Sequence, residues 1–292
     1  MNRSTSSWVS LGVMPVFVLL WGSAAIFTRW GLNHGSPFTL LILRFSLALA
    51  VMLLVGCKRR RWLPAAGTRL RVAATGFMLI GGYSICYFQA MNHGITPGVI
   101  ATLLGVQPIL TLLLLERRIS ALRIIGLGTA LSGLVLVVYQ SLLAAQFSLT
   151  GSLFALAALG FMTLGAILQK QVQQHPADVM PLQYGVSLLL CVAFAPFEPL
   201  DFSFDTGLVV PVIWLGLVIS VGAQLMLYRM IQSGNLVNVT SLFYLVPVVT
   251  VVLDYLLLGN TLSPLSLAGM ALIMLGLAAV FKAPRRGLCI NN

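Results

Sequence analysis

The amino-acid sequence predicts an all-α integral membrane protein with ten transmembrane helices. Of its 292 residues, 59% are hydrophobic and only 8% are charged, whereas soluble chains usually carry roughly a quarter charged residues. The mean hydropathy of +1.00 indicates the same class. The apolar residues gather into ten runs, each about the 20 residues that a helix needs to cross the hydrocarbon core. No polar stretch is long enough to form a soluble domain.

The ten runs follow one another with short connections. We expect them at residues 9–29, 37–57, 72–92, 95–115, 122–142, 149–169, 179–198, 207–228, 236–257 and 263–282. The first run is longer than the roughly 7–15 apolar residues of a signal peptide, so we interpret it as a retained span. The longest polar connection, residues 58–71, is too short to hold a separate catalytic domain.

The basic residues predict an orientation. Lys and Arg concentrate in cytoplasmic loops of membrane proteins. If the N-terminus is cytoplasmic, fifteen of the seventeen basic residues lie on the inner side. The two exceptions are Arg29 and Arg44, and the acidic residues Glu198, Asp201 and Asp205 lie outside. An even number of spans places the C-terminus in the cytoplasm as well. Topology therefore explains the net charge of +11 better than nucleic-acid binding does.

The sequence offers no pattern typical of an enzyme or a metal protein. The four cysteines are scattered, and no pair has the spacing of a metal site. The H-E-x-x-H motif of zinc proteases is absent, and so are paired carboxylates within the spans. We therefore expect no metal, no cofactor, no disulfide framework and no enzymatic activity, although an integral membrane enzyme is the main alternative from another functional class.

The two halves of the chain resemble each other. The matched positions recur in the same order in both halves: Gly22 with Gly165, Pro108 with Pro247, Gly126 with Gly269, and Gly133 with Gly276. We expect one five-helix repeat at residues 1–144 and a second at residues 145–292. Because five is odd, the second repeat enters the membrane from the opposite side. Such inverted repeats recur in transporters whose halves rock about a central site, although a repeat kept only for assembly is the alternative.

Several short motifs resemble the drug/metabolite transporter superfamily. They are Trp21–Gly22 in the first span, Arg44–Phe45 in the second, the segment from Gln107–Pro108 to Glu116 and Ser120, and its repeat from Val246–Pro247 to Ser263–Pro264. The similarity covers the whole chain and is closest to the ten-span, EamA-type branch. Asn260 departs from the pattern, because the second half of that branch often has Glu there.

The resemblance implies a basket of ten helices around a central cavity, lined mainly by spans one, three, four, six, eight and nine. It also implies movement of small metabolites across the inner membrane of bacteria, often as export. Within the branch the chain looks most like exporters of amino acids, including aromatic ones. A carrier for another metabolite or a drug is the alternative, and the sequence does not indicate an oligomeric state.

Polar and aromatic residues inside the spans are the candidates for substrate binding. Tyr83 and Tyr87 are four residues apart, so they share one helix face. Their rings would stack on an aromatic substrate or receive an ammonium group, unless they pack only against neighbouring helices. Gln224 and Tyr228 share a face in the eighth span. The Gln224 amide would bind a substrate carboxylate or tie two helices together.

Further candidates are Gln107 and four residues for which ordinary packing is the alternative role: Trp21, Phe161, Trp214 and Tyr244. Pro108 and Pro247 interrupt helical hydrogen bonding in corresponding spans, so we expect either paired bends that change during transport or static kinks.

Arg44 is the clearest anomaly in the sequence. It lies about 10 Å along the second span from its start, where a charge is costly and is usually paired or faces water. We expect a conformational role, with Asp254 as one conceivable partner. Alternatively, the side chain extends outward to lipid headgroups. No acidic residue lies at the middle of a span, so the sequence favours downhill transport or a coupling route that it does not reveal.

Overall fold

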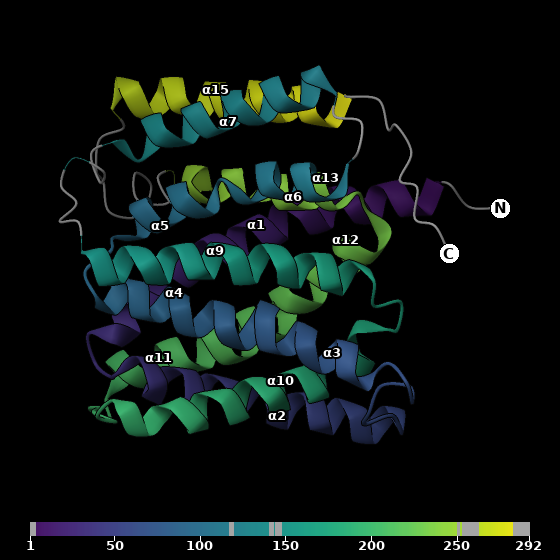
Figure 1. The fold of residues 1–292 in the computed structure, drawn as a ribbon, viewed down its shortest axis with the longest axis vertical. Helices are drawn as coiled ribbons and strands as arrows, with labels where there is room; N and C mark the ends of the chain where they lie inside the picture. The colour runs from purple at the N-terminus through teal and green to yellow at the C-terminus, as the bar shows by residue number, and fades with distance from the viewer. Residues whose placement is uncertain are drawn as a thin grey trace.

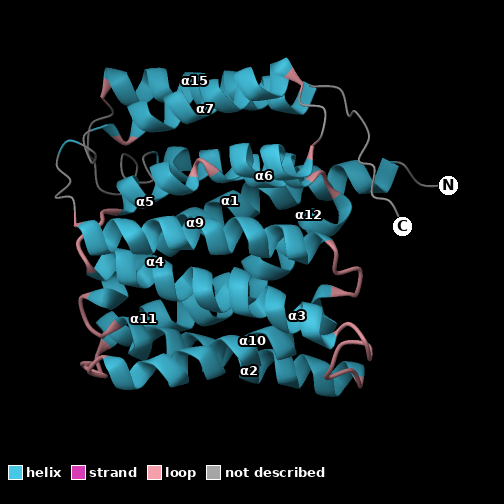
Figure 2. Ribbon diagram, viewed as in Figure 1, coloured by secondary structure: helices cyan, strands magenta, loops and turns pink. Residues whose placement is uncertain are grey.

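The computed structural model describes residues 4–116, 120–139, 143, 148–249, 252 and 263–282. The regular secondary structure of these residues is helical, apart from an isolated bridge between Gly35 and Phe202. Figure 2 shows the helices running side by side, with their connections gathered at two ends. The all-α fold class is therefore confirmed for the described part of the chain.

In the first half the helices are α1 (Ser4–Leu32), α2 (Pro37–Arg59), α3 (Arg69–Thr75), η1 (Gly76–Gly82), α4 (Tyr83–Asn92), α5 (Pro97–Leu104), α6 (Gln107–Leu115) and α7 (Ala121–Val137). In the second half they are α9 (Leu149–Lys170), α10 (Pro176–Phe194), η2 (Ala195–Phe197), α11 (Thr206–Ile213), η3 (Trp214–Ala223), α12 (Gln224–Ser233), α13 (Leu236–Ser241), η4 (Leu242–Tyr244) and α15 (Pro264–Lys282). Residues 245–249 continue as helix after η4.

Eight of these helical segments are long and apolar enough to cross a membrane. They are Val13–Leu32, Pro37–Arg59, Arg69–Asn92, Pro97–Leu115, Leu149–Lys170, Pro176–Phe197, Thr206–Ser233 and Pro264–Lys282. Two further apolar segments, Ala121–Val137 and Leu236–Val249, are shorter over the described residues. Eight of the expected spans are thus found at their expected places, and the total of ten stays a prediction.

Proline starts four of the helices. Pro37, Pro97, Pro176 and Pro264 are the first residues of α2, α5, α10 and α15. The first residue of a helix has no intrahelical partner for its N–H, and proline has no N–H to leave unpaired. The prolines that mark connections in the sequence therefore also fix where the next helix begins.

Two spans contain a π-helical stretch in corresponding places. In the first half, η1 leads directly into α4, and in the second half η3 leads directly into α12. Each π-helix packs against the second helix of the other half, η1 on α10 and η3 on α2. The approach is close, since a Cβ added at Gly76 would lie 2.6 Å from the Cα of Gln183. A wider π-turn shifts the phase of the side chains that follow it.

The two spans that carry the candidate proline bends are interrupted. In the first half, the helix breaks between α5 and α6 at residues 105–106, and Pro108 lies in the first turn of α6. In the second half, the 3-10 turn η4 separates α13 from the helical residues 245–249, which include Pro247. Broken helices at corresponding places of two halves are typical of transporter binding sites.

The helices that close the two halves pack backbone to backbone. Figure 1 shows α7 and α15 side by side. A Cβ added at Gly126 would lie 2.8 Å from the Gly276 carbonyl oxygen, and one at Gly269 would lie 2.6 Å from that of Gly133. In the sequence match, Gly126 corresponds to Gly269 and Gly133 corresponds to Gly276. Each glycine of α7 therefore contacts the α15 glycine that corresponds to the other glycine of α7, so the two contacts are reciprocal. Any side chain at these four positions would force the two helices apart.

The connections define two ends of the bundle, which we name the Arg29 end and the Lys170 end after residues in the last turns of α1 and α9. At the Arg29 end, His34 contacts Asp205 at 3.0 Å. At the Lys170 end, Arg59 donates to Asp178 at 3.1 Å. Both contacts join one half of the chain to the other. Helix α1 begins, and α15 ends, at the Lys170 end (Figure 1).

Candidate functional site

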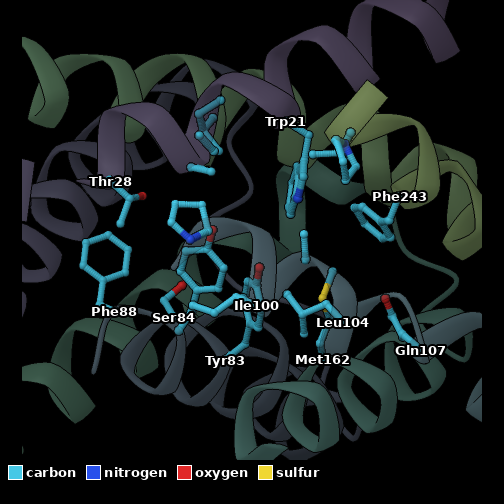
Figure 3. Close-up of a pocket in the computed structure, with 18 of the residues that line it drawn as sticks. Trp21, Thr28, Tyr83, Ser84, Phe88, Ile100, Leu104, Gln107, Met162 and Phe243 are labelled. Atoms are coloured by element: carbon cyan, nitrogen blue, oxygen red, sulfur yellow. The ribbon is translucent and has the colours of Figure 1, made fainter. Parts of the chain in front are cut away.

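A cavity of about 320 Å³ lies between the two halves of the bundle. All six spans expected to line it contribute residues, and α2, α7 and α10 add Arg44, Val137 and Tyr184. Most lining residues lie near the middle of their spans or nearer the Arg29 end, as Thr28 of α1 and Pro97 of α5 illustrate. Figure 3 shows Trp21 and Thr28 from α1 facing Tyr83 and Ser84 across it.

Tyr83 and Tyr87 line the cavity together from α4. Their ring centroids are 5.7 Å apart at an interplanar angle of 44°. The pair follows η1 directly, so the end of the π-helix sets which face of α4 it occupies. Two adjacent ring faces form a surface suited to a flat apolar group or to a cation.

Arg44 also lines the cavity, from α2. Its Nε donates a hydrogen bond of 2.8 Å to the Ser220 hydroxyl on η3. The Tyr184 hydroxyl of α10 donates to the backbone carbonyl of the same serine. The arginine is thus held among the helices by a hydrogen bond to the other half of the chain, which argues against the alternative that it extends to the headgroups. Asp254, its conceivable partner, lies outside the described residues.

Two glutamines line the cavity from opposite halves. Gln107 begins α6, is 1% exposed, and has no hydrogen-bond partner for either amide atom within the described residues. Gln224 begins α12, immediately after η3. A buried amide without partners is costly, so Gln107 is a strong candidate for contact with a bound molecule or with water.

Aromatic rings close one side of the cavity. Trp21 and Phe243 both line it, with ring centroids 5.5 Å apart. Phe17 completes the cluster behind them, at 5.2 Å from Trp21 and 5.9 Å from Phe243. This cluster joins α1 to η4, so it links the first helix of one half to the broken span of the other.

Four of the aromatic candidates lie outside the cavity lining. Trp214 stacks on Phe27 at 4.9 Å, and its indole N–H donates to Ser23 at 2.8 Å, so it fixes η3 against α1. Phe161 meets Phe77 edge to face at 6.0 Å. Tyr228 and Tyr244 are fully buried in the protein core. Their rings are used in helix packing, which is the alternative role that the sequence left open for such residues.

The two candidate prolines also differ. Pro247 lines the cavity, whereas Pro108 is buried behind it. Because Pro108 falls in the first turn of α6, it starts a helix after a break and does not bend a continuous one.

Sequence reasoning missed Tyr184, Ser84 and Thr28, which also line the cavity. Tyr184 had a usable signal, since it is a tyrosine hydroxyl inside an apolar run. Thr28 and Ser84 had none, because small hydroxyl residues are common in packed membrane helices.

The lining supports binding more readily than catalysis. It combines aromatic and aliphatic surface with one positive charge, tyrosine hydroxyls and two amides. Among the described residues no cluster of three His, Cys, Asp or Glu side chains is placed to hold a metal ion. The arrangement therefore suits a small organic molecule with a polar end.

Comparison with known proteins gives a consistent family. A model of the EamA-like transporter family matches residues 7–139 and 149–282. A probable amino-acid metabolite efflux pump of Salmonella typhimurium is 25% identical over 89% of this chain and 90% of its own length. The similarly named protein of Escherichia coli is 24% identical over 91% and 93%. An uncharacterized transporter of Archaeoglobus fulgidus is 25% identical over 92% and 98%.

A solved crystal structure has the same fold. It superposes with a TM-score of 0.75 at 22% sequence identity, over 95% of this chain and 96% of the other. At this identity the likeness supports the fold alone.

Proposed function

Because this chain belongs to the EamA-like transporter family of the drug/metabolite transporter superfamily, we propose that it exports amino acids, including aromatic ones, by alternating access. The chain is a multi-pass membrane transporter, and its family and its relatives carry the names of transporters. The observation that carries the finer proposal is the cavity between the halves, lined by the Tyr83–Tyr87 pair and Arg44. The names of the Salmonella and Escherichia relatives support the substrate class.

The proposed architecture is ten spans in two inverted repeats, residues 1–144 and 145–292. The reciprocal glycine contacts of α7 and α15 support it. The packing of η1 on α10 and of η3 on α2 also supports it, because each π-helix contacts the second helix of the other half. Two related units that meet about a common cavity can open it first at one end and then at the other.

The proposed orientation places the Lys170 end in the cytoplasm of a bacterial cell, with the membrane being the inner one. Arg59, Arg60 and Arg61 follow one another at this end, and Asp201 and Asp205 lie at the Arg29 end. This distribution follows the positive-inside rule. The cavity then lies toward the outer side of the membrane, since more of its lining residues lie toward the Arg29 end than toward the Lys170 end.

Flux through proteoliposomes tests the function. We expect purified protein to release preloaded, labelled phenylalanine with saturable kinetics that other aromatic amino acids compete. Tyr83→Ala and Tyr87→Ala should change the ratio of aromatic to aliphatic flux, because both rings line the cavity. Tyr139→Ala is a matched control, since Tyr139 is 42% exposed and lies outside the lining. Absence of flux across a broad panel of amino acids and metabolites would refute the proposal.

Labelling of Cys57 tests the orientation. Its thiol is exposed near the end of α2, at the Lys170 end. With Cys289 replaced by Ser, a membrane-impermeant maleimide should label Cys57 in inside-out vesicles and leave it unlabelled in spheroplasts. A cysteine at exposed Asn33, at the Arg29 end, should give the opposite pattern once Cys57 is also replaced by Ser. The same pattern at both sites would contradict the proposed topology.

A further inference from the structure

Arg44 is the one charged side chain among the described residues that line the cavity. It lies on α2 well inside the span, about 10 Å along the helix from Pro37. Its Nε is engaged by Ser220 at 2.8 Å. A guanidinium has five N–H donors, so this bond leaves those of the two terminal nitrogens available.

No carboxylate in the described part of the chain neutralises this charge. The ion pairs found there join His34 to Asp205, Arg59 and Arg61 to Asp178, and Arg123 to Glu116. A cation at this depth is costly unless it is paired or faces water. The cavity beside Arg44 is therefore the place where a negative charge is most strongly favoured.

The anchoring of Arg44 holds it in one position. Ser220 accepts from the Arg44 Nε through its hydroxyl and from Tyr184 through its carbonyl, so Ser220 anchors the guanidinium and is itself tied to α10. Tyr83, Tyr87 and Tyr184 line the same cavity and lie within electrostatic range of Arg44. A guanidinium that is held in one orientation suits the paired oxygens of a carboxylate.

Gln107 provides an independent indication that the cavity receives a polar ligand. Its side chain is 1% exposed and lines the cavity, yet both its amide atoms lack partners within the described residues. No described lining residue is a carboxylate that would receive an ammonium group. A substrate amino group would therefore meet only neutral groups, namely amide or hydroxyl oxygens and ring faces, whereas a substrate carboxylate would meet a full positive charge.

We propose that Arg44 binds the carboxylate of the transported molecule, so that the cavity selects organic carboxylates with an apolar or aromatic body and requires the carboxylate more than the amino group. This inference rests on the proposed transport function, and it replaces the conformational role expected for Arg44 with a role in substrate recognition. Amino acids form one part of this class, and the corresponding acids that lack an amino group form another.

A matched series of three ligands tests the requirement. L-phenylalanine has both groups, 3-phenylpropanoate keeps only the carboxylate, and 2-phenylethylamine keeps only the amine. Each is used to compete the flux of labelled phenylalanine in proteoliposomes that contain the full chain. We expect phenylpropanoate to compete within a few-fold of unlabelled phenylalanine. Phenylethylamine should be weaker by about 10- to 100-fold, the range expected for loss of a charge-assisted hydrogen bond.

Substitutions then assign the preference to Arg44. Arg44→Gln should make phenylpropanoate and phenylethylamine compete equally. Arg44→Lys should still favour phenylpropanoate, but by a smaller factor, because the charge remains without the forked geometry. Arg29→Gln is the matched control and should leave the preference unchanged, since Arg29 is exposed and lies outside the lining. Thermal unfolding of each variant in nanodiscs checks that it is folded.

The outcomes separate this inference from the transport function. If phenylethylamine competes as well as phenylpropanoate in the unsubstituted protein, the role of Arg44 is wrong and transport stands. The same holds if a folded Arg44→Gln retains the preference for the carboxylate. If Arg44→Gln does not fold, the ligand series on the unsubstituted protein and on Arg44→Lys decides the point. Absence of phenylalanine flux in the unsubstituted protein would instead refute the transport function.

Discussion

Each half of the chain has a basic residue in the last turn of its first helix, and the two make unequal contacts. Lys170 of α9 donates to the carbonyls of Ile231, Gln232 and Gly234 at 2.6, 3.0 and 2.6 Å, at the end of α12. Arg29 of α1 approaches the Met91 carbonyl, near the end of α4, at 3.5 Å. Both residues reach the end of the third span of their own half.

These contacts hold the two ends of the bundle with unequal strength. At the Lys170 end, the orphan carbonyls of a helix terminus receive a full ammonium group, which is favourable by both hydrogen bonding and the helix dipole. At the Arg29 end the corresponding contact is at the limit of a hydrogen bond. The cavity lies toward this looser end, and the alternating access proposed above would exchange the roles of the two positions.

Among the variants that weaken either end, Lys170→Met should lower the free energy of unfolding the most. It removes three charge-assisted hydrogen bonds from the end of α12, and we expect a loss of about 2 kcal/mol after solvent screening. Thermal unfolding in nanodiscs would measure the loss, and Lys58→Met, at an exposed position in the last turn of α2, is the control. Equal stability of the two variants would show that the Lys170 contacts contribute nothing to closure.

Asp178→Asn should have the next largest effect. The carboxylate is 7% exposed and accepts from Arg59, with Arg61 at 3.6 Å, so it ties α2 to the first turn of α10. We expect a loss of about 1–2 kcal/mol. Asp205→Asn, at the opposite end, should lower the free energy of unfolding by less, because that carboxylate is 47% exposed to solvent. The reverse order would contradict the view that the Lys170 end is the more firmly closed.

Lowering the pH should destabilise the Lys170 end by protonating His175. Burial lowers the pKa of His175, neighbouring Arg59 and Arg229 lower it further, and Asp178 opposes them. The neutral ring also accepts the Ala177 N–H at 3.2 Å, as a cap of α10. A lowered pKa means that the folded protein prefers the neutral form. The contribution of the neutral His175 ring to the stability of the folded protein is therefore complete above the ordinary pKa of about 6.5, and it is lost as the pH falls below that value.

Unfolding midpoints between pH 8 and pH 5 measure this effect. As the pH falls, the unfolding midpoint of His175→Asn should decrease less than that of the unsubstituted protein, because asparagine caps the helix without titrating. Parallel declines would exclude His175 as a contributor.

Arg29→Met should have the smallest effect. The side chain is exposed and its contact is long, so we expect a change in unfolding free energy within about 0.5 kcal/mol. The same unfolding assay measures it beside Lys170→Met. A loss as large as that of Lys170→Met would remove the difference between the two ends.

The sequence located the spans well, because hydropathy and proline positions determine where apolar helices begin. It did not reveal η1 and η3, since in a run that is apolar on every face the period of the pattern cannot distinguish an α-helix from a π-helix. Tyr83 and Tyr87 were found because four-residue spacing survives within α4. The sequence pattern indicated an interruption of the fourth span at Pro108 and not at residues 105–106, because proline is the visible signal for a bend. In the structure Pro108 lies in the first turn of the next helix.

The cavity itself depended on contacts between distant segments. Arg44 and Ser220 lie on different halves, and nothing in their local sequences connects them. The sequence showed that Arg44 was anomalous and left its partner open. Residue type made Trp214 and Phe161 candidates for the lining, with ordinary packing as the alternative. Aromatic rings fit equally well between helices, and only the packing of α1, α9 and the π-helices decides which rings reach the cavity.

The contact between α7 and α15 has a consequence for biosynthesis. The glycine face of α7 is complementary to a helix that the ribosome makes more than a hundred residues later. At roughly 5–20 residues per second, α7 waits on the order of ten seconds in the membrane before its partner exists. During that interval lipid or an insertion chaperone must cover the glycine face. Another copy of the chain offers the same complementary face, which is the exchange of identical elements that domain swapping requires.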